Sequence, residues 1–163
     1  MPRLARFIVF ALTLLLVLPA GSEAIAQEKA ERVKFDPTRD AAKDIDDAVR
    51  AATASGKRII LDVGGEWCSW CHKLDKFFDE NEDVNEFMMD NYVVVKVNYS
   101  KENKNEEVLS RYPEIKGYPH LFVLDSNGAL LHSQDTGLLE SGKYHDRDKV
   151  FAFLKEWAPK KGS

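Results

Sequence analysis

The sequence predicts a mixed α/β domain in which helices cover both faces of a central β-sheet. Two short apolar segments rich in β-branched residues, 58–63 and 92–99, have the composition of buried strands. Segments with helical spacing of apolar residues precede, separate and follow them. The Asp-Ser-Asn-Gly sequence at 125–128 predicts a tight hairpin between two later strands. Because helix-linked strands are parallel and hairpin strands are antiparallel, we expect a mixed sheet.

The first half of this domain is expected to alternate helices with the two buried strands. Apolar residues recur at helical spacing from Ala41 to Ala52, and Gly56 is placed to end that helix. The strand 58–63 runs into GGEWCSWCHKLDKFF (64–78), where helical spacing resumes. A short helix over 82–91 then leads into the strand 92–99.

The second half predicts a short helix, a hairpin and a closing helix. The helix is expected around Glu106–Tyr112, and the hairpin strands at 121–124 and 129–133. Apolar positions in HDRDKVFAFLKEWA (145–158) predict an amphipathic C-terminal helix. The expected order is α-β-α-α-β-α-β-β-α, with 138–145 as an ordinary loop.

The N-terminus has the features of an export signal. Arg3 and Arg6 precede an uncharged segment of fourteen residues, 7–20, and Ala-Ile-Ala at 24–26 predicts cleavage before Gln27. Fourteen apolar residues fall short of the roughly 20 that cross a bilayer as a helix. We therefore expect a signal peptide at 1–26 and a periplasmic location, with an uncleaved membrane anchor as the alternative.

Removal of residues 1–26 leaves 137 residues, the size of one domain with its own core. We expect 27–32 to be a flexible lead and 33–163 to be the domain, acting as a monomer. That mature chain has 21 basic and 26 acidic residues, a balance that argues against nucleic-acid binding. Two cysteines are too few for a disulfide scaffold, so we expect them to carry chemistry.

Both cysteines lie in WCSWCH, residues 67–72, which is compatible with four kinds of site. Cys-x-x-Cys-His is the haem-attachment motif of c-type cytochromes. Cys-x-x-Cys by itself can supply two of the four ligands of a zinc site, form a redox-active dithiol, or form a local structural disulfide. Haem is disfavoured because cytochrome c domains are helical, whereas this motif follows a predicted strand. Zinc is disfavoured because the four histidines show no paired ligand spacing. We expect a dithiol with no metal and no cofactor.

The predicted junction of strand and helix at Cys68 suits a redox thiol. The first turn of a helix has unpaired N–H groups and the positive end of the helix dipole, and both stabilise a thiolate. Helical spacing puts Cys71 one turn later on the same face. We therefore expect Cys68 to attack a substrate disulfide and Cys71 to resolve the mixed disulfide.

Two segments together resemble the signatures of the thioredoxin superfamily. ILDVGGEWCSWCHK (60–73) is similar to its active-site strand, turn and helix, and EIKGYPHLFVLDSNGAL (114–130) is similar to its cis-proline loop and hairpin. The resemblance covers roughly 33–157 and implies a thioredoxin fold. It is closest to exported thioredoxin-like proteins and to the C-terminal domain of the transmembrane reductase that carries electrons into the periplasm.

The resemblance also implies roles for residues outside the cysteine pair. It assigns Trp67 to the tryptophan that covers the thiols, and Asp62 to the buried acid that relays the proton of Cys71. Pro119 corresponds to the cis-proline, and Tyr118 before it presents backbone to an extended substrate. We therefore expect Asp62 to act with the cysteines, and Trp67, Tyr118 and Pro119 to bind substrate.

These features together predict a periplasmic thiol–disulfide oxidoreductase that reduces or interchanges protein disulfides, recharged by a membrane thiol electron donor. The alternative is a thioredoxin-fold chaperone or adaptor whose cysteines have little catalytic part. Ser69 and Trp70 between the cysteines differ from the dipeptides of well-known family members, so the reduction potential is left open.

Overall fold

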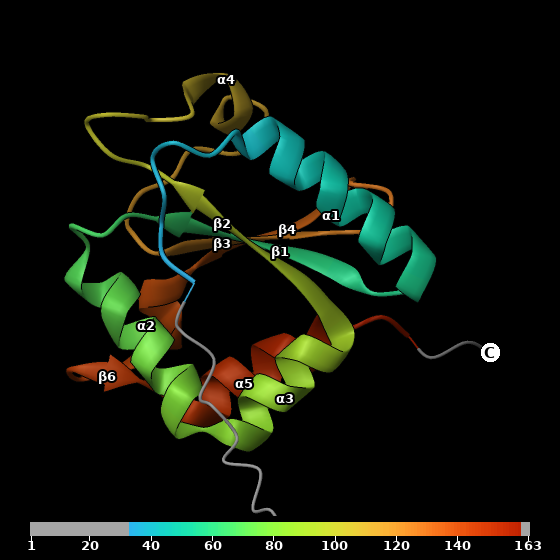
Figure 1. Ribbon diagram of the computed structural model, residues 1–163. Coiled ribbons are helices and arrows are strands. Elements are labelled where there is room, and N and C mark those ends of the chain that lie inside the picture. The colour runs from blue at the N-terminus through green and yellow to red at the C-terminus, as the bar shows by residue number, and fades with distance from the viewer. Residues whose placement is uncertain (1–32, 161–163) are drawn as a thin grey trace, which may run out of the picture. The chain divides into compact units, whose positions relative to one another are not determined.

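The computed structural model describes residues 33–160 and contains a four-stranded sheet with helices on both faces (Figure 1). The strands follow the order β2-β1-β3-β4, with bounds Tyr92–Asn98, Arg58–Gly64, His120–Leu124 and Leu130–Asp135. β1 pairs with β2 in parallel and with β3 antiparallel, and β3 pairs antiparallel with β4. The predicted mixed α/β architecture is confirmed.

The helices divide between the two faces of the sheet, as Figure 1 shows. One face carries α1 (Ala41–Ser55) and α4 (Glu106–Leu109). The other carries α2 (Ser69–Glu80), α3 (Glu82–Asn91) and α5 (Arg147–Glu156). Apart from the segment 136–145, the order of helices and strands agrees with the one expected from the sequence.

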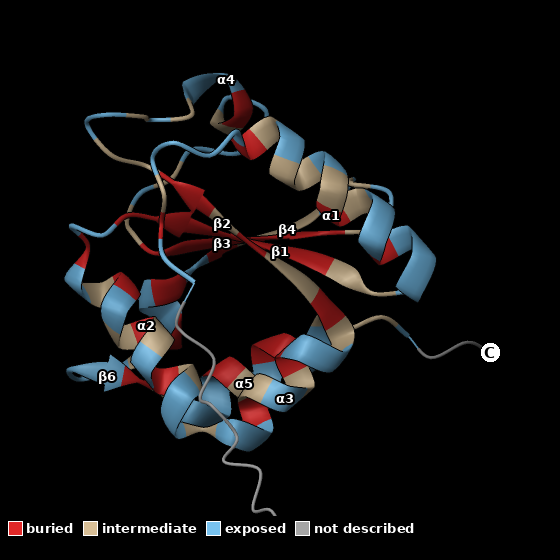
Figure 2. Ribbon diagram, in the orientation of Figure 1, coloured by how far each residue is buried: buried red, intermediate tan, exposed pale blue. Residues whose placement is uncertain are grey.

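The side chains of β1 point alternately to the two faces of the sheet, and each face has its own hydrophobic core. Ile59 and Leu61 pack in the cluster under α1, while Ile60 packs with α2, α3 and α5. Because side chains alternate along a strand, Asp62 and Gly64 lie on the same face as Ile60. The central strands are accordingly the most continuously buried part of the ribbon in Figure 2. A carboxylate is thus placed in an apolar layer directly under α2.

The segment 138–145 differs from the loop expected there. Two-residue strands β5 (Glu140–Ser141) and β6 (Tyr144–His145) form a short antiparallel hairpin after the 3₁₀ helix η1 (Thr136–Leu139). Gly142 has φ 64°, a conformation that glycine adopts without strain, and it allows the chain to reverse within two residues. No strand-length apolar pattern marks such short strands, which explains why sequence reasoning missed them.

Two predictions concern residues that the structure does not describe. The signal peptide at 1–26 and the lead at 27–32 lie outside residues 33–160, as do the last three residues of the predicted domain. Within the described part of the chain, no helix has the length and apolar character needed to cross a membrane.

The last residue of β1 determines how closely α2 approaches the sheet. A Cβ atom on Gly64 would lie 2.5 Å from Sγ of Cys71 and 3.0 Å from Cζ of Phe35. No Cβ atom fits at such distances, so only glycine at this position allows the sulfur to sit against the strand. The packing of the Cys71 sulfur against β1 therefore depends on glycine at position 64.

Substitution of Gly64 tests this packing. We expect Gly64→Ala to lower the free energy of unfolding by about 2 to 3 kcal/mol, because the added methyl group overpacks the Cys71 contact. Urea unfolding of the oxidised protein measures the effect. Gly117→Ala is the matched control, since a Cβ there meets no atom within 4 Å. Equal stability of the two variants would contradict the packing argument.

Candidate active site

The two cysteines form a disulfide at the start of α2. Cys68 is the N-cap residue of this helix, and its N–H donates to the carbonyl oxygen of Gly65 at 2.9 Å. The disulfide joins Cys68 to Cys71, whose Cα atoms are 5.2 Å apart. The helix therefore begins directly after Cys68, as predicted from the sequence, and Cys71 follows one helical turn later.

The helix start surrounds the Cys68 sulfur with favourable electrostatics. The backbone N–H of Cys71 donates to Sγ of Cys68 at 3.1 Å, in the position of an N-cap hydrogen bond. The positive end of the α2 dipole lies at the same point. In the reduced protein both features stabilise a thiolate on Cys68, which is the form that attacks disulfides.

Phe35, a residue that sequence reasoning missed, buries the disulfide. It packs in one cluster with Cys68 and Cys71, which are 4 % and 1 % exposed. The backbone N–H of Phe35 donates to Oε1 of Glu66 at 2.9 Å, and this bond ties the segment before α1 to the active-site turn. Phe35 lies outside any periodic segment, so only the folded chain reveals its contact with the cysteines.

An aromatic surface flanks the disulfide on the side of the Tyr118–Pro119 peptide bond, which is cis. The Trp67 ring meets the Tyr118 ring edge-on at 5.6 Å between centroids, and Tyr118 stacks on Tyr99 at 4.9 Å. Nε1 of Trp67 donates to the carbonyl oxygen of Tyr99 at 2.6 Å. Trp67 is nevertheless 59 % exposed, so its indole is fixed in place yet open to a partner.

Tyr118 on this surface is a neutral hydrogen-bonding group. Burial, with further contributions from the charge of Tyr99 and its hydrogen bond, raises the pKa of Tyr118 to about 12.

Pro119 is buried, and its carbonyl oxygen accepts from the hydroxyl of Thr136. A hollow of about 530 Å³ lies beside Trp67 and Tyr99 and is bordered by residues 100–102 and Lys104. The structure thus brings Trp67, Tyr118 and Pro119 to one edge of the disulfide.

Asp62 lies in the sheet beneath α2, in a buried network of charges. Nζ of Lys96, on the neighbouring strand β2, lies 2.8 Å from Oδ2 of Asp62 and 2.6 Å from Oδ1 of Asp75 on α2. The parallel register of β1 and β2 places Asp62 directly opposite Lys96. Burial opposes the charge on Lys96, but attraction to the two carboxylates outweighs it and raises the lysine pKa.

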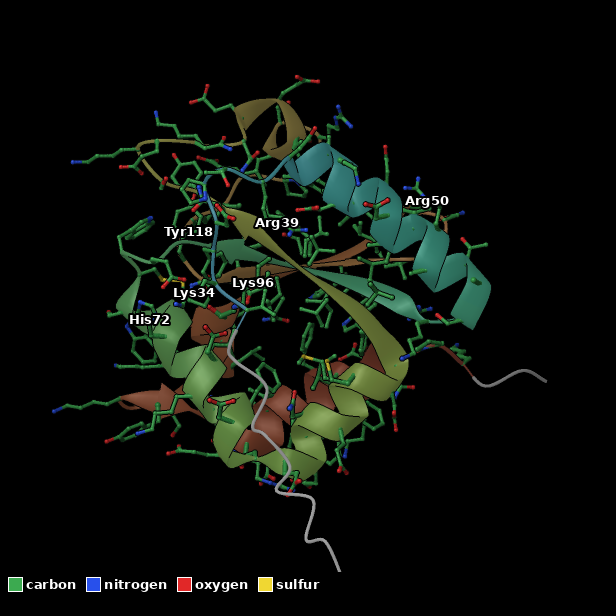
Figure 3. All side chains as sticks on the ribbon, viewed as in Figure 1. Lys34, Arg39, Arg50, His72, Lys96 and Tyr118 are labelled. Carbon is green, nitrogen blue, oxygen red and sulfur yellow. A yellow bond between two sulfur atoms is a disulfide. The ribbon has the colours of Figure 1, made fainter. Side chains whose placement is uncertain are left out.

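Lys96 also connects the charge network to the cysteines. Its ammonium lies 4.2 Å from the centre of the Phe35 ring, and Phe35 in turn packs against Cys68 and Cys71. Figure 3 shows Lys96, Tyr118 and His72 around the N-terminal end of α2. The single lysine in the apolar strand YVVVKVNY was a signal that could have revealed this partner, because a buried lysine needs a counter-charge.

His72 has a local structural contact at the start of α2. The residue is exposed, and its Nε2 lies 2.8 Å from the carbonyl oxygen of Glu66. Within residues 33–160, no three His, Cys, Asp or Glu side chains gather in a way that could hold a metal ion.

Comparison with known proteins agrees with this geometry. The profile of the family described as Thioredoxin-like matches residues 40–126, more than half of the chain. The chain is 24 % identical over 154 residues to the thiol:disulfide interchange protein DsbD of Salmonella typhi, an alignment that covers 89 % of this chain and 26 % of that protein. With DsbD of Actinobacillus pleuropneumoniae the identity is 24 % over 96 residues, covering 58 % and 16 %. The chain therefore spans about a quarter or less of these relatives.

Two solved structures resemble the fold. A disulphide isomerase from Xylella fastidiosa matches with a TM-score of 0.66 and 23 % identity, over 78 % of this chain and 98 % of that one. The oxidised C-terminal domain of DsbD from Neisseria meningitidis matches with a TM-score of 0.56 and 18 % identity, over 77 % and 99 %. The thioredoxin fold predicted from the sequence is confirmed, and this chain belongs to the thioredoxin-like family.

Proposed function

We propose that this chain is an exported thiol–disulfide oxidoreductase that reduces or interchanges disulfides of other proteins. The observation that carries the proposal is the position of Cys68, whose sulfur accepts the Cys71 N–H at the first turn of α2 while joined to Cys71 in a disulfide. Membership of the thioredoxin-like family and similarity to proteins named thiol:disulfide interchange proteins support it.

The proposed reaction proceeds in two exchanges. The Cys68 thiolate attacks one sulfur of a substrate disulfide, so that an S–S bond forms to Cys68 while the substrate bond breaks and its second sulfur leaves as a thiolate. Cys71 then loses its proton and attacks Sγ of Cys68, which releases the other substrate sulfur. Two electrons pass from the cysteines to the substrate, and the Cys68–Cys71 disulfide is the product.

Substrate docking is assigned to the aromatic surface beside the disulfide. Trp67 offers an exposed apolar face, and Tyr118 and Pro119 offer the backbone of the chain segment leading into β3. An extended segment of a substrate protein that carries a cysteine could lie along the Tyr118–Pro119 backbone with the Trp67 ring beside it. The oxidised pair then needs a reductant, for which we propose a membrane thiol electron donor.

Substitution of each cysteine separates catalysis from binding. We expect Cys68→Ser to abolish reduction of insulin disulfides, because no thiolate remains to attack. Cys71→Ser should instead accumulate a mixed disulfide with substrate on Cys68, detectable by non-reducing electrophoresis and mass spectrometry. Ser69→Ala is the control that leaves both sulfurs in place. Activity of Cys68→Ser in vivo equal to that of the parent would instead identify a chaperone or adaptor whose cysteines have little catalytic part.

Asp62 is proposed to accept the proton of Cys71 in the second exchange. It lies on the face of β1 that α2 covers, two residues before Gly64, which contacts the Cys71 sulfur. Asp62 shares the ammonium of Lys96 with Asp75, in a part of the protein where all three side chains are largely buried. A group so placed can take up a proton without contact with bulk water.

The Asp62→Asn variant tests this step. We expect release of the mixed disulfide to slow at pH 6 to 7 and to recover toward pH 9, because a Cys71 thiol that ionises by itself needs no base. Rapid-quench measurement of the second exchange follows it. Asp75→Asn is the matched control, since it also removes a carboxylate bonded to Lys96. Identical pH profiles for both variants and the parent would rule out a specific role for Asp62.

Location and processing are proposed from the N-terminal sequence. Residues 1–26 act as a signal peptide, 27–32 form a lead, and 33–163 form the redox domain in the periplasm. We expect a bacterial host to release a chain whose intact mass corresponds to cleavage before Gln27. Replacement of Leu14 and Leu15 by arginine should keep the chain inside the cell. Recovery of the full-length chain from membranes would support an uncleaved anchor instead.

A further inference from the structure

The hairpin of β5 and β6 lies beside α2 (Figure 1). Its last residue, His145, is only 7 % exposed. Among residues 33–160, neither ring nitrogen of His145 has a hydrogen-bond partner. A buried imidazole without hydrogen bonds is costly, so its apolar contacts must account for its position.

Those contacts are with α2. The His145 ring meets Trp70 edge-on at 5.5 Å between centroids, and it lies 6.2 Å from the ring of Phe77. Burial, and secondly the charge of Lys73, lowers the pKa of His145 to about 4. The imidazole is therefore neutral near pH 7 and packs as an aromatic ring against the tryptophan between the two cysteines.

The hairpin makes a second contact with the same helical turn. Nζ of Lys73 donates to the carbonyl oxygen of Lys143 at 3.1 Å and lies 3.7 Å from the centre of the Trp70 ring. His145 thus contacts the Trp70 ring, and the Lys143 carbonyl oxygen accepts from the Lys73 ammonium that lies over the same ring. Trp70 itself packs on the cluster of Phe35 and the cysteines.

We propose that the hairpin is a positioning element for the redox pair: it holds Trp70 against Cys68 and Cys71, with the Lys73 ammonium over the Trp70 ring, and so sets their reduction potential. This inference rests on the proposed redox function. Reduction breaks the S–S bond and frees a thiolate at the start of α2. A fixed cation one turn into the helix stabilises that thiolate relative to the disulfide, which has no charge to stabilise.

The test is the equilibrium with glutathione, in which the disulfide and two glutathione thiols give the dithiol and glutathione disulfide. We expect Lys73→Met to favour the protein disulfide by about three- to tenfold, or about 15 to 30 mV toward more negative potential. His145→Ala should shift the glutathione equilibrium in the same direction by about threefold, because Trp70 loses its ring contact with the hairpin and the Lys73 ammonium over Trp70 is no longer held in place. His145→Phe, which keeps a ring against Trp70, should restore the parent value.

His132→Ala is the matched control. Its imidazole stacks on Trp157 at 4.4 Å, so the variant also removes a histidine–tryptophan contact, here on β4 and after α5 rather than at the cysteines. We expect no change in the glutathione equilibrium for this variant. Lys73→Met changes only a half-buried surface side chain, so it reports on the charge even if His145→Ala does not fold.

The outcomes separate this inference from the proposed function. If the parent pair equilibrates with glutathione and reduces insulin, but Lys73→Met and folded His145→Ala stay within the range of His132→Ala, the positioning role is wrong. If His145→Ala fails to fold, an unchanged equilibrium in Lys73→Met is enough to overturn the positioning role. If the parent pair exchanges with neither glutathione nor insulin, the redox function itself fails.

Discussion

The approach of α2 to the end of β1 is the contact on which the site depends. The Cys71 sulfur would lie only 2.5 Å from a Cβ atom at Gly64, so this packing requires glycine at that position. That contact fixes the start of α2, and with it Cys68 at the N-cap. The helix dipole and the Cys71 N–H then act on the Cys68 sulfur. The absence of a side chain at Gly64 thus allows the helix that carries both cysteines to pack against the β-sheet.

The charges under α2 form a second constraint on the same region. Lys96 and its partners Asp62 and Asp75 have side chains about a tenth exposed. Removing Lys96 would leave two buried carboxylates without the ammonium that they share, a loss on the order of 3 to 5 kcal/mol. The Phe35 ring also contacts the Lys96 ammonium. The network joins β1, β2 and α2, the helix that carries the cysteines.

Regular elements could be predicted from local patterns, and long-range contacts could not. The strands 58–63 and 92–99 are apolar over most of their length, and the CXXC helix has clear periodicity, so their type and order were predictable. The neighbours of the cysteines were harder, because Phe35 lies in no periodic segment and His145, taken as the first residue of the closing helix, lies in β6 instead. A short hairpin such as β5–β6 has no pattern long enough to recognise.

The sequence by itself determined that a cysteine pair follows a buried strand and opens a helix, since strand composition, helical spacing and the CXXC motif are all local properties. Only the tertiary structure decided which groups surround that pair. Asp62 meets Lys96 through the register of two strands, and Trp70 meets His145 through the hairpin after η1. Such contacts join segments tens of residues apart, so they depend on how the elements pack rather than on the composition of any one of them.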